Sequence, residues 1–265
     1  MIVISKYEQI LNMWRSTPIN TIGDLEFKLD NFRVLFAFHS NKIENPETTY
    51  HDTREIFENG MVVNFTGNAR TLLEQQNQKA CYDVLRNYIV SRNPITVELV
   101  KEIHLLLTAG TYDERRYVDN DERSGEFKKR DYVTGIYEVG SKPANVEKDI
   151  LELINEISNE NNTNTLKIGT YLHARFEYIH PFADGNGRAG RTLLNYFLML
   201  NDHPPLIVYD EDKKLYYEAL EKYDKDEDIE PLYNFFIYST EKTWNNALSR
   251  ETELENEGYE EDLEP

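Results

Sequence analysis

The sequence predicts an all-α protein with one short β-hairpin, and two kinds of pattern support this fold class. Apolar residues recur every three or four positions in several segments, which is the spacing of one buried helix face. One segment instead gathers β-branched and aromatic residues between glycines, as a hairpin does. The helical segments are residues 99–107, 146–157, 168–179 and 193–200, and the hairpin segment is residues 124–141.

The length of the chain, 265 residues, suits one domain with a helical extension. We divide it into an N-terminal helical segment at residues 1–60, a core at residues 61–250 and an acidic tail at residues 251–265. The tail carries eight acidic residues and no basic residue. We therefore expect it to be solvated, and disordered at its end.

Charge and composition exclude several classes of partner. The formal net charge is −19, and so acidic a chain repels nucleic acids and anionic membranes. No stretch approaches the roughly 20 apolar residues that span a bilayer, and the N-terminus does not read as a signal peptide. Cys81 is the single cysteine, so no intramolecular disulfide can form. We expect a soluble, cytoplasmic protein with no nucleic-acid or membrane partner.

A loop between two helical segments holds the residues best suited to chemistry. It occupies residues 180–191 and reads His-Pro-Phe-Ala-Asp-Gly-Asn-Gly-Arg-Ala-Gly-Arg. The free N–H groups and positive dipole at the start of the next helix form an anion cradle, and Gly185 and Gly187 allow a ligand to approach it. Arg188 and Arg191 lie three positions apart on one helix face, where two guanidinium groups suit a polyphosphate.

Two other residues of this loop add the remaining chemistry. Asp184 offers a hard oxygen ligand for the Mg²⁺ that accompanies polyphosphates. His180 can take up a proton near neutral pH. Together with the cradle they predict nucleotidyl or phosphoryl transfer. Residues 185–190 also spell the G-x-G-x-x-G of dinucleotide-binding folds, but that motif follows a β-strand, whereas helical periodicity precedes it here.

Residues 180–191 resemble the complete signature of the Fic family, His-x-Phe-x-Asp/Glu-Gly-Asn-Gly-Arg-x-x-Arg, with every fixed position present. The resemblance extends over residues 35–245, and Ser124-Gly-Glu-Phe is similar to the start of the family's flap. It implies a Fic-type helical bundle with a short β-hairpin flap. It also implies transfer of AMP from ATP, the co-substrate, to a Tyr, Thr or Ser hydroxyl of a protein, with Mg²⁺ as cofactor.

The resemblance assigns a role to each residue of the loop. His180 is expected to be the general base, and Asp184 the ligand of the Mg²⁺ that bridges the α- and β-phosphates. Arg191 is expected to hold the γ-phosphate, and Phe182 to anchor the loop. The anion hole is expected to consist of Gly185, Asn186, Gly187 and Arg188.

The flap and a later helix are expected to complete the nucleotide site. The flap edge beside the nucleotide would be Tyr132, Val133, Thr134 and Gly135, and a target protein, which could be a second copy of the chain, would dock there as an added strand. Tyr216 is expected to line the adenine side of the pocket. Asp224 stands near the base where relatives carry Asn.

A second motif suggests regulation. Residues 40–45 read Ser-Asn-Lys-Ile-Glu-Asn, which resembles the family's inhibitory motif, Ser/Thr-x-x-x-Glu-Gly/Asn. Its inhibitory residues would be Ser40, Glu44 and Asn45. Because the motif precedes the core, the chain resembles the class with an N-terminal inhibitory helix. In that class Glu44 is expected to form a bidentate pair with Arg191 and so to inhibit the enzyme.

The resemblance leaves other activities open. Some relatives transfer UMP, phosphate or phosphocholine, and others remove AMP from a modified protein. Gly187 argues against the phosphate-transferring relatives, which carry Lys there. A different class is a non-catalytic binding module of the toxin–antitoxin type, which the presence of His180, Asp184 and both arginines disfavours.

Overall fold

The computed structural model describes residues 4–159 and 164–261, and it confirms the mostly helical fold. No helix in these residues is both long and apolar enough to cross a membrane. Two short 3₁₀ turns, η2 and η3, and one π-helical turn, η1, connect the longer helices. The helices are α1 (Lys6–Ser16), α2 (Ile22–Glu44), α3 (Tyr50–Asn59), α4 (Ala69–Val90), α5 (Val97–Thr108), η1 (Arg115–Asp119), η2 (Pro143–Asn145), α6 (Val146–Asn159), α7 (Thr165–Ile179), α8 (Asn186–Leu200), η3 (Asp210–Asp212), α9 (Lys213–Asp226) and α10 (Glu230–Glu261).

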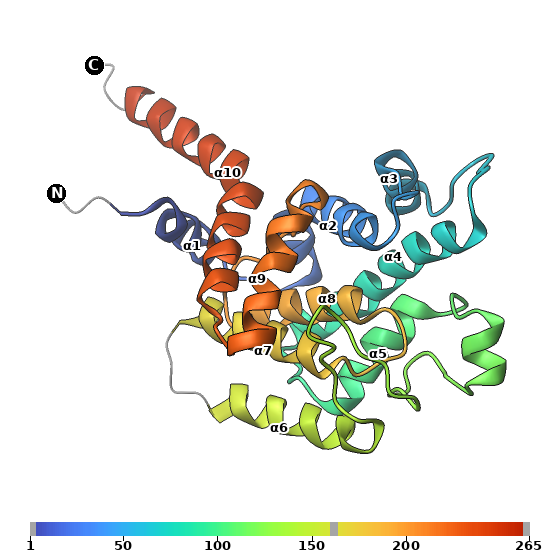
Figure 1. The fold of residues 1–265 in the computed structure, drawn as a ribbon. Coiled ribbons are helices and arrows are strands. Elements are labelled where there is room, and N and C mark those ends of the chain that lie inside the picture. Colours follow the sequence, from blue (N-terminus) through green and yellow to red (C-terminus); the bar gives the residue numbers. More distant parts are fainter. Residues whose placement is uncertain (1–3, 160–163, 262–265) are drawn as a thin grey trace.

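Helix α8 forms the centre of the bundle (Figure 1). It contacts α2, α4, α5 and α7, and nearly all of its residues are buried. A helix surrounded on every side needs small residues where its neighbours come close, and Gly190 meets this need. A Cβ atom there would lie 2.4 Å from Glu177 Oε1 on α7. The first turns of α8, which form the second half of residues 180–191, are thereby fixed within the core.

Helix α2 runs across this core and ends beside the loop. It begins with a capping box, in which Asp24 N donates to Thr21 Oγ1 and Thr21 N donates to the Asp24 side chain. It ends at Glu44, where Asn45 takes an extended conformation and Pro46 follows. Residues 1–60, predicted to be helical, contain α1, α2 and α3.

The predicted hairpin is represented by a single antiparallel bridge between Thr134 and Val139. Thr134 N donates to Val139 O over 2.8 Å, and Val139 N donates back over 3.0 Å. Gly135 and Glu138 close the loop between them with positive φ angles of 69° and 50°. No strand is assigned within residues 4–159 and 164–261, so the β-hairpin flap stays a prediction.

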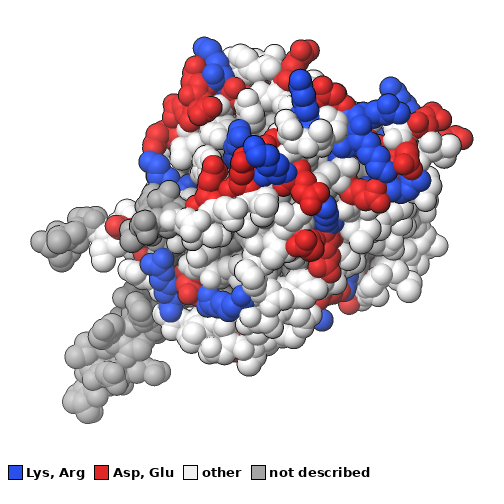
Figure 2. All heavy atoms as spheres, turned by 90° about the horizontal axis from the view of Figure 1, so that it is seen from below, with Lys and Arg blue, Asp and Glu red and all other residues white. Residues whose placement is uncertain are grey.

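The C-terminal part of the chain is more helical than we expected from the sequence. Helix α10 continues through Glu261 and so includes most of the acidic tail, whose end we expected to be disordered; residues 262–265 lie outside the described residues. Figure 1 shows the second half of this helix extending past the other helices. On the face seen in Figure 2, basic side chains are interspersed with acidic ones and large areas carry no charge, which is not the basic surface that nucleic acids require.

Candidate active site

The loop between α7 and α8 is held in a sharply defined shape. His180 ends α7 with a left-handed backbone, φ 49° and ψ 63°, which is uncommon for a residue other than glycine. Gly185 begins α8 with φ 81°, and a Cβ atom there would lie 2.6 Å from Thr108 Cγ2. Glycine is therefore required at this position. Strained backbone of this kind is typical of functional sites.

Asn186 braces the loop from inside. Its Oδ1 accepts a hydrogen bond from Phe182 N, and its Nδ2 donates to Phe182 O, both over 2.8 Å. The same Nδ2 lies 3.0 Å from His180 Nε2. Asn186 is expected to form part of the anion hole, and its side chain holds Phe182 and the ring of His180 in place.

His180 is neutral at physiological pH. Burial, together with the nearby charge of Lys128, lowers the pKa of its imidazole to about 4. A neutral ring has a lone pair that can take up a proton, as a general base needs, and here the lone pair of Nε2 accepts the hydrogen bond of Asn186 Nδ2. The ring lies in the same cleft as the anion cradle.

His104 on α5 packs against the loop and bonds to it, a role that the sequence did not reveal. Its ring stacks on Phe182 with centroids 3.7 Å apart and planes 2° from parallel. Gly125 N donates to His104 Nδ1 over 2.9 Å, so Nδ1 is the acceptor and Nε2 donates to Asp184 O over 2.8 Å. His104 thus ties the loop to α5 and to the segment after it.

Asp184 presents an ionised carboxylate to the cleft. Burial alone would raise its pKa, but the charges of Arg116 and Arg70 outweigh burial and hold the pKa below its usual value. Oδ1 accepts a hydrogen bond from Gly185 N over 2.8 Å, and Oδ2 accepts one from Arg70 Nη2 over 2.8 Å. One hard, anionic oxygen facing a cleft fits Mg²⁺, which takes few protein ligands and keeps phosphate and water oxygens.

The two motif arginines are buried beneath the start of α8. Arg188 and Arg191 each expose only 2% of their surface. Arg188 Nε and Arg191 Nη1 are buried donors without a hydrogen-bond partner among the described residues. Buried donors are rarely left unpaired. Their presence beside free helix N–H groups therefore indicates an anion site.

Glu44 fills part of that site. Arg191 Nη2 donates to Glu44 Oε1 over 2.8 Å and to Ser40 O over 2.9 Å, while Arg191 Nε donates to Ser40 Oγ over 3.1 Å. The expected pair is therefore present, but the expectation that it is bidentate is wrong: Glu44 accepts one bond, Ser40 accepts from Nε and Nη2, and Nη1 has no partner among the described residues. A Cβ atom at Gly187 would lie 2.4 Å from Glu44 Oε1, so the carboxylate rests on the cradle itself.

These residues surround one cleft with a volume of about 410 Å³. Three segments far apart in the sequence form it: the end of α2, the start of α4 and the loop before α8. The cleft is lined by Glu44, Asn45, Arg70, Glu74, His180, Ala183, Asp184, Gly185, Asn186, Gly187 and Arg188.

Of the two residues expected at the base end of the nucleotide, Asp224 lies near the flap and Tyr216 lies in the core. Asp224 lies beside the flap, because a Cβ atom on Gly135 would be 3.2 Å from Asp224 Oδ2, and burial raises the pKa of Asp224 to about 6. Tyr216 does not line the cleft as we expected. It is 1% exposed, and its hydroxyl lies 2.7 Å from His173 Nε2 in the core. Its neighbour Tyr217 is the one that borders a surface hollow.

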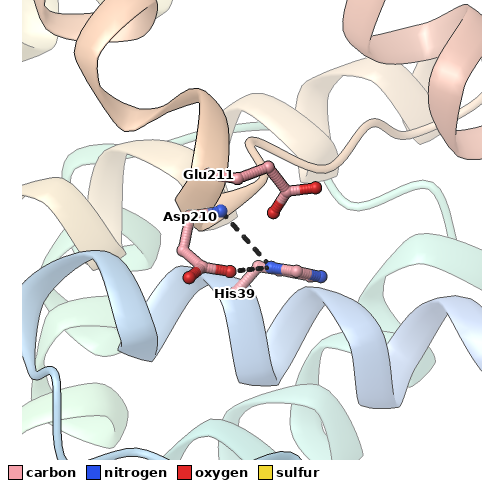
Figure 3. A group of neighbouring side chains, drawn as sticks. All are labelled: His39, Asp210 and Glu211. Carbon is pink, nitrogen blue, oxygen red and sulfur yellow. Dashed lines mark hydrogen bonds and ion pairs between the residues drawn. The ribbon is translucent and has the colours of Figure 1, made fainter.

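A second group of titratable side chains, which does not line the cleft, attaches α2 to η3 (Figure 3). His39 Nδ1 lies 2.7 Å from Asp210 Oδ1 in η3, and Glu211 points toward the same ring. Lys242 Nζ is 2.9 Å from Glu211 Oε1, so a cation already balances this acid. We assign these residues to the attachment of α2 rather than to chemistry.

Comparisons with known proteins find a family match and named relatives for this chain. The Fic/DOC family pattern matches residues 94–198, which include the loop of residues 180–191. The chain is 31% identical over 222 residues to the "Protein adenylyltransferase Fic" of Nematostella vectensis, a match that covers 81% of this chain and 48% of that protein. It is 29% identical over 222 residues to the protein of the same name from Drosophila persimilis, covering 82% and 41%.

Solved structures support the same fold. A Fic-domain-containing signalling protein from Bacteroides thetaiotaomicron superposes with a TM-score of 0.79 at 21% identity, over 92% of this chain and 96% of that one. Fic-1 from C. elegans superposes with a TM-score of 0.74 at 20% identity, over 95% and 71%. Residues 94–198 carry a Fic domain, as the family match shows. The whole chain spans less than half the length of the curated relatives it matches.

Proposed function

We propose that this protein is an adenylyltransferase that moves AMP from ATP to a hydroxyl group of a protein. The observation that carries the proposal is the convergence of a neutral His180, an ionised Asp184 and the free donor of Arg188 in one cleft. Arg191 lies behind the lining of this cleft and reaches it through its contact with Glu44. The relatives named adenylyltransferases support AMP as the transferred group. A non-catalytic module would have no need of these groups, and nothing in the site favours that alternative.

The proposed reaction is an in-line displacement at the α-phosphorus. His180 takes the proton of the attacking hydroxyl, the oxygen forms a bond to the α-phosphorus, and the bond to the β-phosphate breaks to release pyrophosphate. Arg188, Arg191 and the N–H groups of α8 hold the phosphates in line for attack. Mg²⁺ at Asp184 would neutralise charge on the phosphates.

The test is transfer from ATP carrying a label on its α-phosphate, with the variant Glu44→Gly alongside the natural chain. We expect labelled protein, with the mass of one AMP moiety added on a Tyr, Thr or Ser side chain. Label transferred from UTP or CTP but not from ATP would show that the group is another nucleotide. The absence of transfer from any nucleotide by both proteins would refute the proposal.

We further propose that Glu44 inhibits this reaction. Its carboxylate occupies the donor of Arg191 that a γ-phosphate would need, and lies against the backbone of Gly187. ATP bound beside it would have its α-phosphate displaced. A displacement of about 1 Å can lower a rate on the order of 100-fold.

Replacing Glu44 with Gly should therefore raise AMP transfer by at least roughly tenfold, although removal of a paired charge usually harms a protein. The double variant Glu44→Gly with Arg191→Ala should lose this gain, because both changes act through one pair. Glu58, which pairs with Arg54 on the exposed face of α3, provides the matched control Glu58→Gly. Equal transfer rates for Glu44→Gly and the natural chain would show that Glu44 does not inhibit.

The same carboxylate could orient a water molecule for removal of AMP. In that case Glu44→Gly would stop AMP release from a protein that was modified beforehand, while transfer rises. Incubation of the modified protein with each form, followed by mass spectrometry, distinguishes removal from simple inhibition.

The bridge between Thr134 and Val139 suggests how a target protein binds. In an antiparallel pair, the residues beside a hydrogen-bonded pair direct their N–H and C=O groups outward. Val133 is such a residue, and it is 48% exposed. An extended segment of the target could pair with this edge, close to His180's cleft.

Val133→Pro should lower target modification by about fivefold, the loss expected for one backbone hydrogen bond, and leave ATP binding unchanged. Val133→Ala retains the N–H group and is the control. Thr134→Pro is less informative, because the N–H of Thr134 already bonds Val139. A parallel fall in ATP affinity and in modification would mean that the flap is only structural.

A further inference from the structure

Arg70, in the first turn of α4, divides one edge of its guanidinium group between two carboxylates. Its Nε donates to Glu74 Oε1 over 3.0 Å, and its Nη2 donates to Asp184 Oδ2 over 2.8 Å. Nε and Nη2 lie on the same edge of the planar group, which can grip a single carboxylate through two parallel bonds. Through this edge Arg70 can pair fully with Glu74 or with Asp184, but not with both at once.

Both oxygens of Asp184 already have a partner in this arrangement. Oδ1 accepts the hydrogen bond of Gly185 N, and Oδ2 is contacted by Arg70 and, at 3.6 Å, by Arg116. A divalent cation on Oδ2 would lie where the guanidinium group lies, and the two positive charges would repel each other. The metal ion and Arg70 therefore compete for one oxygen.

Glu74 connects Arg70 to the end of α2. It is 4% exposed, and its Oε2 accepts a hydrogen bond from Asn45 Nδ2 over 3.0 Å. Because Asn45 occupies Oε2, Glu74 offers Arg70 only Oε1, and that oxygen also lies 3.4 Å from Arg188 Nη1. The second donor of Arg70 is thus left to bind Asp184.

We propose that Arg70 is a positioning residue that stands in for the metal ion at Asp184, and that the end of α2 keeps it there through Asn45 and Glu74. The inference rests on the proposed function, because it takes Asp184 as the metal ligand. For metal to bind, Arg70 turns from Asp184 to Glu74. Withdrawal of Asn45 favours this turn, because it frees the second oxygen of Glu74.

This arrangement extends the inhibitory action of α2 to both ends of the cleft. Glu44 blocks the phosphate-binding donor of Arg191, and the next residue, Asn45, holds a cation on the metal ligand. Loss of contact at this one helix end frees both the anion site and the metal site.

The experiment measures how strongly Mn²⁺ and a nucleotide assist each other. The affinity of α,β-methylene-ATP, which cannot be cleaved at the α–β bond, is determined by calorimetry in EDTA and again in Mn²⁺. The ratio of the two dissociation constants is the coupling factor. Loss of a positive charge weakens nucleotide binding in both conditions, so the ratio isolates the contribution of the metal and requires no catalysis.

Arg70→Ala should raise the coupling factor about fivefold, as expected for removal of a half-exposed competing ion pair. Arg70→Gln should do the same, because it keeps a hydrogen-bonding group for Glu74 but carries no charge. Arg54→Ala is the matched control, since Arg54 also pairs with a glutamate four residues later, away from the cleft. Its coupling factor should equal that of the natural chain.

Asn45→Ala should raise the coupling factor by about twofold. It should add nothing to Arg70→Ala, because the two act in series. A coupling factor that stays the same or falls in both Arg70 variants overturns the inference. If Asp184→Ala also keeps the natural coupling factor, the metal assignment in the proposed function fails too. A factor lost only in Asp184→Ala overturns the role of Arg70 alone.

Discussion

Replacing His180 with Ala should lower AMP transfer by about 10²–10⁴-fold, the usual contribution of a general base, while ATP binding stays within about threefold. The ring takes no part in the phosphate cradle formed by Arg188, Arg191 and the N-terminus of α8. Transfer is measured with labelled ATP in the Glu44→Gly background, where the rate is high enough to follow. His51→Ala, on the exposed side of α3, is the control.

The pH profile gives an independent check on the same residue. Because burial lowers the pKa of His180 to about 4, the ring is already neutral throughout pH 6 to 8. The base is lost only as the pH falls through about 4, when the ring gains its proton. Protonation of His180 should therefore not lower the rate of transfer anywhere between pH 6 and 8. A fall centred near pH 6.5 would contradict the buried, neutral His180.

Replacing Asp184 with Ala should lower transfer at least about 100-fold, the scale of a lost metal ion that stabilises phosphate charge. Excess EDTA should bring the natural chain to the same level and have no further effect on the variant. Asp202→Ala is the matched control, because Asp202 also pairs with an arginine but lies on the surface, 62% exposed. Full activity in EDTA would show that no metal is needed.

Helical periodicity and the loop motif predicted much of the site before any coordinates. The segment of residues 168–179 lies in α7, and the segment of residues 193–200 lies in α8. The loop residues between them come together because they are neighbours in the chain. The pairing of Glu44 with Arg191 came from the resemblance, since no local pattern relates residues 147 positions apart.

The partners contributed by other helices could not be predicted. Arg70, Arg116 and His104 reach Asp184 from three different segments, and only tertiary packing brings them there. Each of them reads as an ordinary surface or core residue in its own segment. Residues of this kind carry no local signal, because their spacing within a helix is unrelated to their neighbours across the cleft.

The position of Tyr216 differs from our expectation, and the hairpin flap stays a prediction, each for a reason of local geometry. Tyr216 and Tyr217 are adjacent, and a helix turns by about 100° between neighbours, so only one of them can face the core. The sequence could not say which. The flap residues have the composition of strands, but a hairpin without a third strand or a packed face is marginal. A single bridge formed where two strands were expected.

The attachment of α2 to the rest of the chain has a kinetic consequence. Leu25, Leu29 and Ile43 bury the helix along its length, so Glu44 cannot leave as a separate subunit would. A competitor that is covalently tethered has an effective concentration that dilution does not change. Inhibition by Glu44 would then be intramolecular, and its strength would be the same at nanomolar and at micromolar protein concentration. Modification of one copy of the chain by another is second order in protein concentration. A dilution series therefore changes the rate of modification between copies but leaves the inhibition by Glu44 unchanged.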